Sequence, residues 1–112
     1  MMLSCSQGGR PILKSSAYTV DLGKIKADTL YERSVALYNI GEKDLRISRL
    51  SSDCGCTNVS IEKTLIQSND STILHVTLET QGKIGLVDNI VCIEANTDSL
   101  CHFIQVIGNV SN

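Results

Sequence analysis

Apolar and polar residues alternate along most of this chain with a period of two. The clearest example is the run 71–80. Its apolar residues of one parity are Leu74, Val76 and Leu78, and polar residues fill most of the other parity. Successive side chains of a β-strand point to opposite faces of the sheet, so this pattern is typical of a strand with one buried face. No stretch shows a comparable 3.6-residue period, and no helix longer than a turn is expected.

Seven segments of this kind are separated by short turn-forming sequences. We expect strands over residues 18–22, 29–40, 45–50, 59–61, 71–80, 86–95 and 102–110. The first of them ends at Gly23 and is expected at the edge of a sheet. The intervening sequences are rich in Gly, Asn, Asp and Ser, which favour turns. The spacing predicts an all-β fold, an immunoglobulin-like antiparallel β-sandwich of about seven strands.

The composition fits one small domain. The chain has 112 residues, 42% hydrophobic and only 4% aromatic, so Val, Ile and Leu must fill most of the core. Residues 1–16 are rich in turn formers and are expected to be a flexible tether, with residues 17–112 as the domain. The net charge of −2 provides no basic surface for nucleic acid. No apolar run reaches the roughly 18 residues needed to span a bilayer.

Five cysteines are unusual in a chain of this length, and an odd number leaves at least one outside any internal pair. Cys5 is the natural odd one, because it lies in Leu3-Ser4-Cys5-Ser6 and a small polar run follows it. This sequence resembles the cleavage box of a bacterial lipoprotein, in which the cysteine carries lipid. Lipidation of Cys5 would place the protein in the periplasm or at the outer membrane, held there only by that anchor. The alternative is a disordered N-terminus with a stray thiol.

The motif Cys54-Gly55-Cys56-Thr57 is the feature that composition does not explain. Gly55 permits a turn that brings both sulfurs to one side, so free thiols, a disulfide or half of a soft-metal site are all compatible with it. A zinc site needs two further ligands, and the remaining candidates (His75, His102, Cys92 and Cys101) include no second Cys-x-Cys or Cys-x-x-Cys pair. We expect a structural turn with inert thiols, and the alternative is a redox-active or disulfide-linked pair.

The other two cysteines lie on the strands of the last hairpin. A hairpin centred between Asn96 and Thr97 would place Cys92 directly opposite Cys101, near enough to bond. A four-residue loop over 96–99 would shift them out of register. Because the loop composition suits four residues, we expect two free cysteines.

The same hairpin has apolar residues on both of its faces. One face carries Val91, Ile93, Ile104 and Val106, and the other carries Ile90, Cys92, Cys101, Phe103 and Ile107. If the first row faces the core, the second row predicts an interface with a protein partner or a second copy of the chain, anchored by Phe103. The alternatives are inverted parity, which would make Phe103 a core residue, or a central hairpin that its own chain covers on both sides.

No acid–base constellation is present. There are only two histidines, no Gly-x-Ser-x-Gly elbow and no phosphate-binding loop, so an enzyme would have to use Cys54 or Cys56 as its nucleophile. We therefore expect a protein that is not an enzyme and needs no cofactor.

Several short motifs occur in the order of a known family. They are Asn39-Ile40-Gly41, Leu45 with Ile47, Asp53-Cys54-Gly55-Cys56-Thr57, Gly85, Ala95-Asn96 and Gly108-Asn109-Val110. Over residues 18–110 this resembles the bacterial Cys-Gly-Cys-Thr family of immunoglobulin-like domains of unknown function, which is abundant in Bacteroidetes and related in fold to Hydin-type domains. The usual Pro-Gly turn before the central strand is replaced here by Gln67-Ser68-Asn69-Asp70.

The resemblance implies an immunoglobulin-like sandwich of a kind often found in exported proteins, with no established catalytic activity. The sequence therefore predicts a non-catalytic envelope module, a protein-interaction or structural domain of an exported lipoprotein. The alternative is a thiol-redox or soft-metal-binding protein that uses the Cys-Gly-Cys motif.

Overall fold

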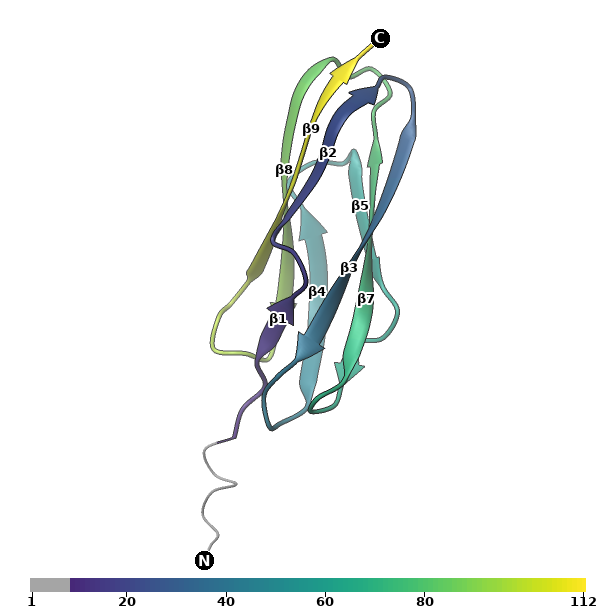
Figure 1. Cartoon of the computed structure of the whole chain (residues 1–112). Helices are drawn as coiled ribbons and strands as arrows, with labels where there is room; N and C mark the ends of the chain where they lie inside the picture. Colours follow the sequence, from purple (N-terminus) through teal and green to yellow (C-terminus); the bar gives the residue numbers. More distant parts are fainter. Residues whose placement is uncertain (1–8) are drawn as a thin grey trace, which may run out of the picture.

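The computed structural model describes residues 9–112, which form two β-sheets packed face to face (Figure 1). The strands are β1 (Leu13–Ser15), β2 (Thr19–Lys26), β3 (Leu30–Asn39), β4 (Leu45–Ser52), β5 (Thr57–Ile61), β6 (Leu65–Ile66), β7 (Ser71–Glu79), β8 (Gly85–Ala95) and β9 (His102–Ser111). One sheet has the order β1-β3-β7-β5 and the other β2-β9-β8-β4-β6. The predicted immunoglobulin-like β-sandwich is confirmed, with every expected strand present.

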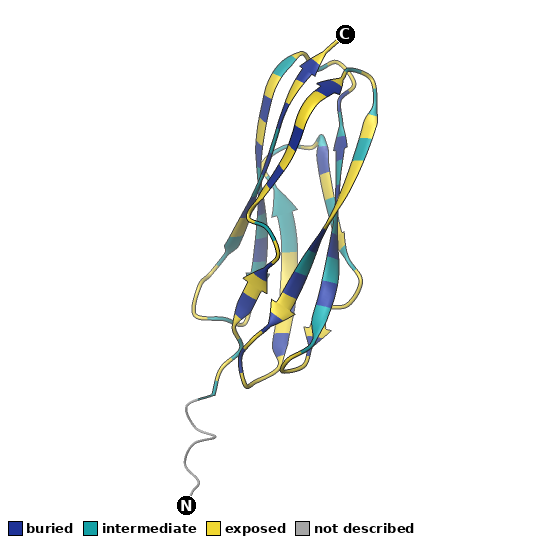
Figure 2. Cartoon of the chain, viewed as in Figure 1, coloured by how far each residue is buried: buried dark blue, intermediate teal, exposed yellow. Residues whose placement is uncertain are grey.

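The strand parities predicted from the sequence are also confirmed, because buried and exposed residues alternate along the strands (Figure 2) and the predicted apolar rows are the buried ones. Leu74, Val76 and Leu78 of β7 are at most 2% exposed. From the opposite sheet, Val91 and Ile93 of β8 and Ile104 and Val106 of β9 are equally buried. The core is almost wholly aliphatic, as the low aromatic content required. Within residues 9–112, no helix is long and apolar enough to cross a membrane.

One strand pair departs from the antiparallel expectation. β2 lies parallel to β9, with Val20 beside Val106. The cause is that β1 and β2 are successive parts of one extended segment, which leaves the first sheet and joins the second at 16–18 without turning back. β2 also continues through Gly23, where we expected it to end. Gly23 has a φ of 69°, which suits glycine, and lies at a register shift between Asp21 and Lys24.

The sandwich begins earlier than the sequence analysis expected. We assigned residues 1–16 to the tether, but Leu13–Ser15 forms β1 and pairs with the end of β3. Leu13 and Ser15 are both buried. A strand with two inward positions is too short to show a recognisable alternation, and for the same reason β6 was missed. Cys5 and its proposed lipidation lie outside the described residues.

Candidate functional site

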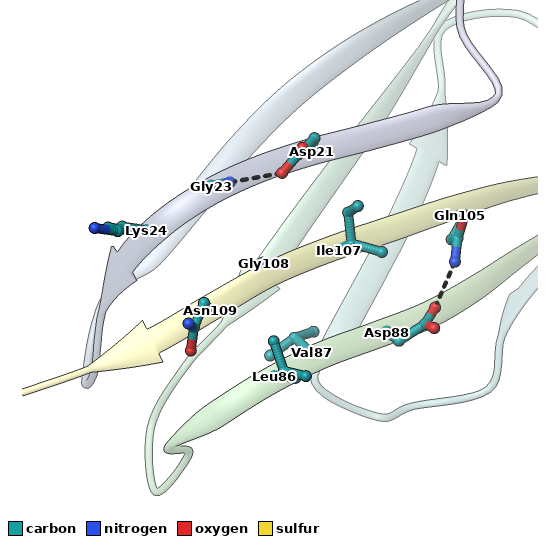
Figure 3. A pocket seen from close by; sticks show the side chains of 10 residues that line it. All are labelled: Asp21, Gly23, Lys24, Leu86, Val87, Asp88, Gln105, Ile107, Gly108 and Asn109. Atoms are coloured by element: carbon teal, nitrogen blue, oxygen red, sulfur yellow. Dashed lines mark hydrogen bonds between the residues drawn. The ribbon is translucent and has the colours of Figure 1, made fainter.

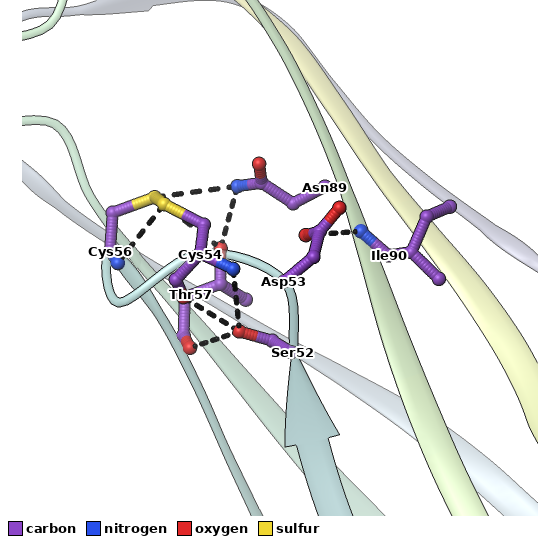
Figure 4. Close-up of a disulfide and its surroundings, with 7 residues drawn as sticks. All are labelled: Ser52, Asp53, Cys54, Cys56, Thr57, Asn89 and Ile90. Atoms are coloured by element: carbon purple, nitrogen blue, oxygen red, sulfur yellow. Dashed lines mark hydrogen bonds between the residues drawn. A yellow bond between two sulfur atoms is a disulfide. The ribbon is translucent and has the colours of Figure 1, made fainter.

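The Cys-Gly-Cys motif forms the connection between β4 and β5, at the end of the four-stranded sheet's edge strand (Figure 4). A disulfide joins Cys54 to Cys56, with 5.2 Å between their Cα atoms. Our expectation of inert free thiols is therefore wrong. Gly55 permits the tight turn that the ring of three residues requires, and its own surroundings are open, since a Cβ there would meet nothing within 4 Å.

The backbone of this loop is fixed by hydrogen bonds that do not involve sulfur. Asp53 exchanges two bonds with Ile90 of β8, because its N–H donates to the Ile90 carbonyl (3.1 Å) and its carboxylate accepts from the Ile90 N–H (2.9 Å). The Thr57 N–H donates to the Cys54 carbonyl (3.1 Å), and the Glu79 N–H donates to the Cys56 carbonyl (2.8 Å). The loop is thus attached to both sheets independently of the S–S bond.

Asn89 is the residue that the sequence analysis missed. Its side chain occupies an inward position of β8 between Val87 and Val91, and it is only 9% exposed. The amide nitrogen donates to Oγ1 of Thr57 (2.8 Å) and lies 3.4 Å from Sγ of Cys56 (Figure 4). A lone Asn in an otherwise apolar inward row was the available signal, since a buried amide requires a partner.

The two sulfurs have different surroundings. Both cysteines are half-buried, but Cys56 packs against the hydrophobic core. Sγ of Cys56 also lies 3.8 Å from the hydroxyl of Thr57, and because a disulfide sulfur carries no proton, the hydroxyl must be the donor. Cys56 is therefore the inner sulfur, with two side-chain donors beside it, whereas Sγ of Cys54 accepts from the backbone N–H of Cys56 (3.1 Å).

The second disulfide links Cys92 to Cys101 on the outer face of the β8–β9 hairpin. Direct cross-strand pairing places Cys92 opposite Phe103, so the shift out of direct register that we expected does occur. Our expectation of free thiols is nevertheless wrong. Cys101 lies just before β9, diagonal to Cys92, and 5.7 Å between the Cα atoms lies within the usual span of a disulfide.

Removing the Cys92–Cys101 bond should destabilise the domain. It closes a loop of about ten residues, for which the chain-entropy estimate is about 2.5 kcal/mol. We expect Cys92→Ala/Cys101→Ala to lower the free energy of unfolding by that amount in urea denaturation. The matched variant Cys54→Ala/Cys56→Ala opens a three-residue ring and should lose less, about 1.5 kcal/mol. If Cys92→Ala/Cys101→Ala and the native chain unfolded at the same urea concentration, the result would contradict a disulfide between Cys92 and Cys101.

The outer face of the same hairpin carries an apolar row, which we call the apolar stripe and define as Leu86, Ile90, Phe103 and Ile107. Leu86 and Phe103 are exposed, and Ile90 and Ile107 are half-buried. The predicted parity is confirmed, because Phe103 is 61% exposed, and the alternative that Phe103 belongs to the core is wrong. Leu86, at 86% exposure, was not among the predicted interface residues. The cross-strand register sets Asp88 opposite Ile107 and Ile90 opposite Gln105, so the apolar residues run diagonally across the two strands.

The stripe ends in an open hollow of about 460 Å³ (Figure 3). Leu86 and Ile107 line it from β8 and β9, and Asp21, Gly23 and Lys24 line it where β2 departs from regular pairing. The N–H of Gly23 donates to the carboxylate of Asp21 (2.9 Å), which holds the bulge in place. On the β8 and β9 side Asp88, Gln105 and Asn109 also line the hollow, so apolar and polar groups are mixed there, and the β2 rim is charged.

The metal candidates are not brought together. In the part of the chain that the structure describes, no three His, Cys, Asp or Glu residues are grouped to hold a metal ion. His75 pairs with Glu62 on the outer face of the four-stranded sheet (2.9 Å). His102 bonds instead to the Thr97 hydroxyl (2.7 Å), and partial burial lowers the pKa of His102 below its ordinary value.

Solved structures share this fold at low sequence identity. A protein of unknown function from Porphyromonas gingivalis W83 matches with a TM-score of 0.80 at 16% identity, over 88% of this chain and 46% of that one. The ASH/PapD-like domain 7 of human CEP192 matches with a TM-score of 0.71 at 14% identity, over 89% and 85% of the two chains. A family 123 glycoside hydrolase from Clostridium perfringens matches with a TM-score of 0.71 at 9% identity, over 85% and 23%.

These similarities establish the fold alone. The chain spans less than half the length of the P. gingivalis protein. Since one of the similar structures is a hydrolase, the fold itself does not decide whether this chain is an enzyme.

Comparison of the whole sequence with family models identifies the family of this chain. No curated protein matches the chain. The family model described as "Protein of unknown function (DUF1573)" matches residues 13–110, from the first residue of β1 to the penultimate residue of β9. The expectation of an immunoglobulin-like domain of unknown function is thereby confirmed. The chain belongs to the DUF1573 family of proteins of unknown function.

Proposed function

We propose that the chain is a non-catalytic protein-binding module of a bacterial envelope lipoprotein, of the Cys-Gly-Cys-Thr type, and that the apolar stripe is its binding surface. The observation that carries the proposal is the exposure of Phe103 and Leu86, with the half-buried Ile90 and Ile107 between them, on a regular, fully paired hairpin. A sheet face in water ordinarily carries polar residues, and contiguous apolar patches on soluble proteins usually mark an interaction site.

The geometry suits a protein partner. Phe103 offers the largest apolar side chain at one end of the stripe, and the hollow beside Leu86 and Ile107 offers a recess at the other. Aromatic anchors and recesses of this kind contribute most of the binding energy at protein interfaces. The hydrogen bond from Gln105 to Asp88 (2.9 Å) lies between the apolar residues and supplies polar groups for orientation. We expect an apolar segment of another protein to lie along β8 and β9.

Two disulfides within residues 9–112 support an oxidising compartment, because cytosolic thiols are normally kept reduced. The proposed lipid on Cys5 would then anchor the domain at the outer membrane or in the periplasm. The presence of the same fold as one part of the longer P. gingivalis chain supports a modular role.

The variant Phe103→Asp tests the binding surface. A side chain that is 61% exposed can be replaced without disturbing the core, so we expect a folded domain with a melting temperature within a few degrees of the native one. Replacing the aromatic anchor of an apolar contact with a carboxylate should weaken binding by about 30-fold or more. Binding would be measured as enrichment of partners from an envelope extract, and self-association by analytical ultracentrifugation.

Leu30→Asp is the matched control, because Leu30 is 54% exposed but belongs to β3 in the other sheet. It should leave the partners bound to the native chain unchanged. Identical partners for the native chain and both variants would refute the stripe as the binding surface. Loss of self-association in Phe103→Asp alone would identify a second copy of the chain as the partner.

A further inference from the structure

We propose that the Cys54–Cys56 disulfide is a thiol–disulfide exchange site that accepts two electrons from an external dithiol, and that Asn89 positions and stabilises Cys56 as the leaving sulfur. This activity is independent of the apolar stripe. It is stoichiometric, because each chain carries one such disulfide and must be reoxidised before it reacts again.

The direction of attack follows from the surroundings of the two sulfurs. Cys56 packs against the core, whereas the turn at Gly55 is exposed and open. An incoming thiolate must approach along the S–S axis from the side opposite the leaving sulfur. The inner position of Cys56 therefore makes Cys54 the sulfur that is attacked and Cys56 the sulfur that leaves.

Asn89 places an N–H donor where negative charge develops. Its amide nitrogen lies 3.4 Å from Sγ of Cys56, and the Thr57 hydroxyl lies 3.8 Å from the same atom. A disulfide sulfur is a weak acceptor and a thiolate is a strong one, so these donors stabilise the departing thiolate more than the starting disulfide. Asn89 is fixed for this task, because it is 9% exposed and is also bonded to Thr57.

The exchange has two balanced steps. A thiolate of the dithiol attacks Sγ of Cys54, which forms a mixed disulfide and releases Cys56 as a thiolate. The second thiol of the reductant then loses its proton to solvent. The resulting thiolate attacks the reductant's first sulfur, which is bonded to Cys54 in the mixed disulfide, and releases Cys54 as a thiolate. The dithiol leaves as a disulfide, oxidised by two electrons, and the Cys54–Cys56 pair is reduced by two.

The loop can hold both redox states. The bonds from Asp53 to Ile90, from Thr57 to Cys54 and from Glu79 to Cys56 are all made by backbone or carboxylate groups. Breaking the S–S bond therefore leaves the turn in place, with the two thiols still adjacent. The Cys92–Cys101 pair differs, since no N–H or O–H donor to either of its sulfurs is found among residues 9–112.

The Cys92–Cys101 pair serves as an internal control for the test. The chain carrying Cys5→Ser, which removes the fifth thiol, is treated with dithiothreitol in native buffer and sampled over time. Free thiols are alkylated and each pair is quantified by peptide mass spectrometry. We expect Cys54–Cys56 to be reduced at least about tenfold faster than Cys92–Cys101. Equal rates, or slower reduction of Cys54–Cys56, would overturn the proposal, and this comparison requires no variant of the site.

Asn89→Leu then tests the role of the amide. Loss of one donor to a partly charged sulfur should slow reduction of Cys54–Cys56 about fivefold and leave the rate at Cys92–Cys101 unchanged. Thr72→Val is the matched control, because it also removes a buried polar contact, between the Thr72 hydroxyl and the Lys63 N–H (3.0 Å), but away from both disulfides, and it should leave both reduction rates unchanged.

Melting curves of both variants show whether they fold. If Asn89→Leu does not fold, Asn89→Asp supplies the same shape without an N–H donor and should be slowed at least as much. A folded Asn89 variant that exchanges at the native rate would refute the positioning role.

Discussion

Replacing Asn39 with Leu should lower the free energy of unfolding by about 4 kcal/mol. The Asn39 side chain is fully buried and bonds to four backbone groups, two in the turn that follows it and one in each of two distant segments. Its amide nitrogen donates to the carbonyls of Lys43 (2.7 Å) and Ile66 (2.9 Å), and its oxygen accepts from the N–H groups of Gly41 (3.0 Å) and Ile12 (3.4 Å). Leu has similar volume but no polar atoms, so these groups would lose their partner while still buried.

Urea denaturation of Asn39→Leu measures the loss. The matched control is Asn58→Leu, because Asn58 is exposed on β5 and the same substitution there should change stability by less than about 0.5 kcal/mol. Similar midpoints for the two variants would show that Asn39 does not connect the segments at this end of the sandwich.

Leu74→Ala should cost about 3 kcal/mol. Leu74 lies on β7 between β3 and β5 and is 0% exposed, so truncation removes buried apolar surface and leaves a cavity lined by both sheets. Leucine-to-alanine changes at such positions in other proteins cost about 2–5 kcal/mol. Because the neighbouring strands pair with β7 along most of its length, the site has little freedom to collapse.

Leu30→Ala is the corresponding control, since it makes the same chemical change at the end of β3, where the side chain is 54% exposed. It should cost less than about 1 kcal/mol. If the two leucine variants melted at the same temperature, the assignment of Leu74 to the core would be wrong.

The fold was largely predictable because one physical signal dominates this sequence. Alternation of apolar and polar residues identified the seven main strands and the buried row of β7, but it left open which apolar row of the β8–β9 hairpin is buried. It failed for β1 and β6, which are three and two residues long and cannot display a period. It also failed to predict the parallel pairing of β2 with β9, because alternation carries no information about the direction of a neighbouring strand.

The candidate site was only half predictable. Cys54, Gly55, Cys56 and Thr57 are adjacent in sequence, so the motif could be recognised there. Asn89 is separated from Cys56 by 33 residues and meets it only because β8 and β5 face each other across the sandwich. The pairing of Cys92 with Cys101 depended on the exact register of the β8–β9 hairpin, which loop composition predicted only approximately.

The sequence by itself therefore determined the strand content, which residues share a face of each strand and the positions of both cysteine pairs, since these depend on residues close together along the chain. Only the tertiary structure decided which sulfurs bond, which side chain lies beside Cys56 and whether Phe103 faces solvent. Each of these depends on contacts between segments distant in sequence, and such contacts are set by sheet order and register.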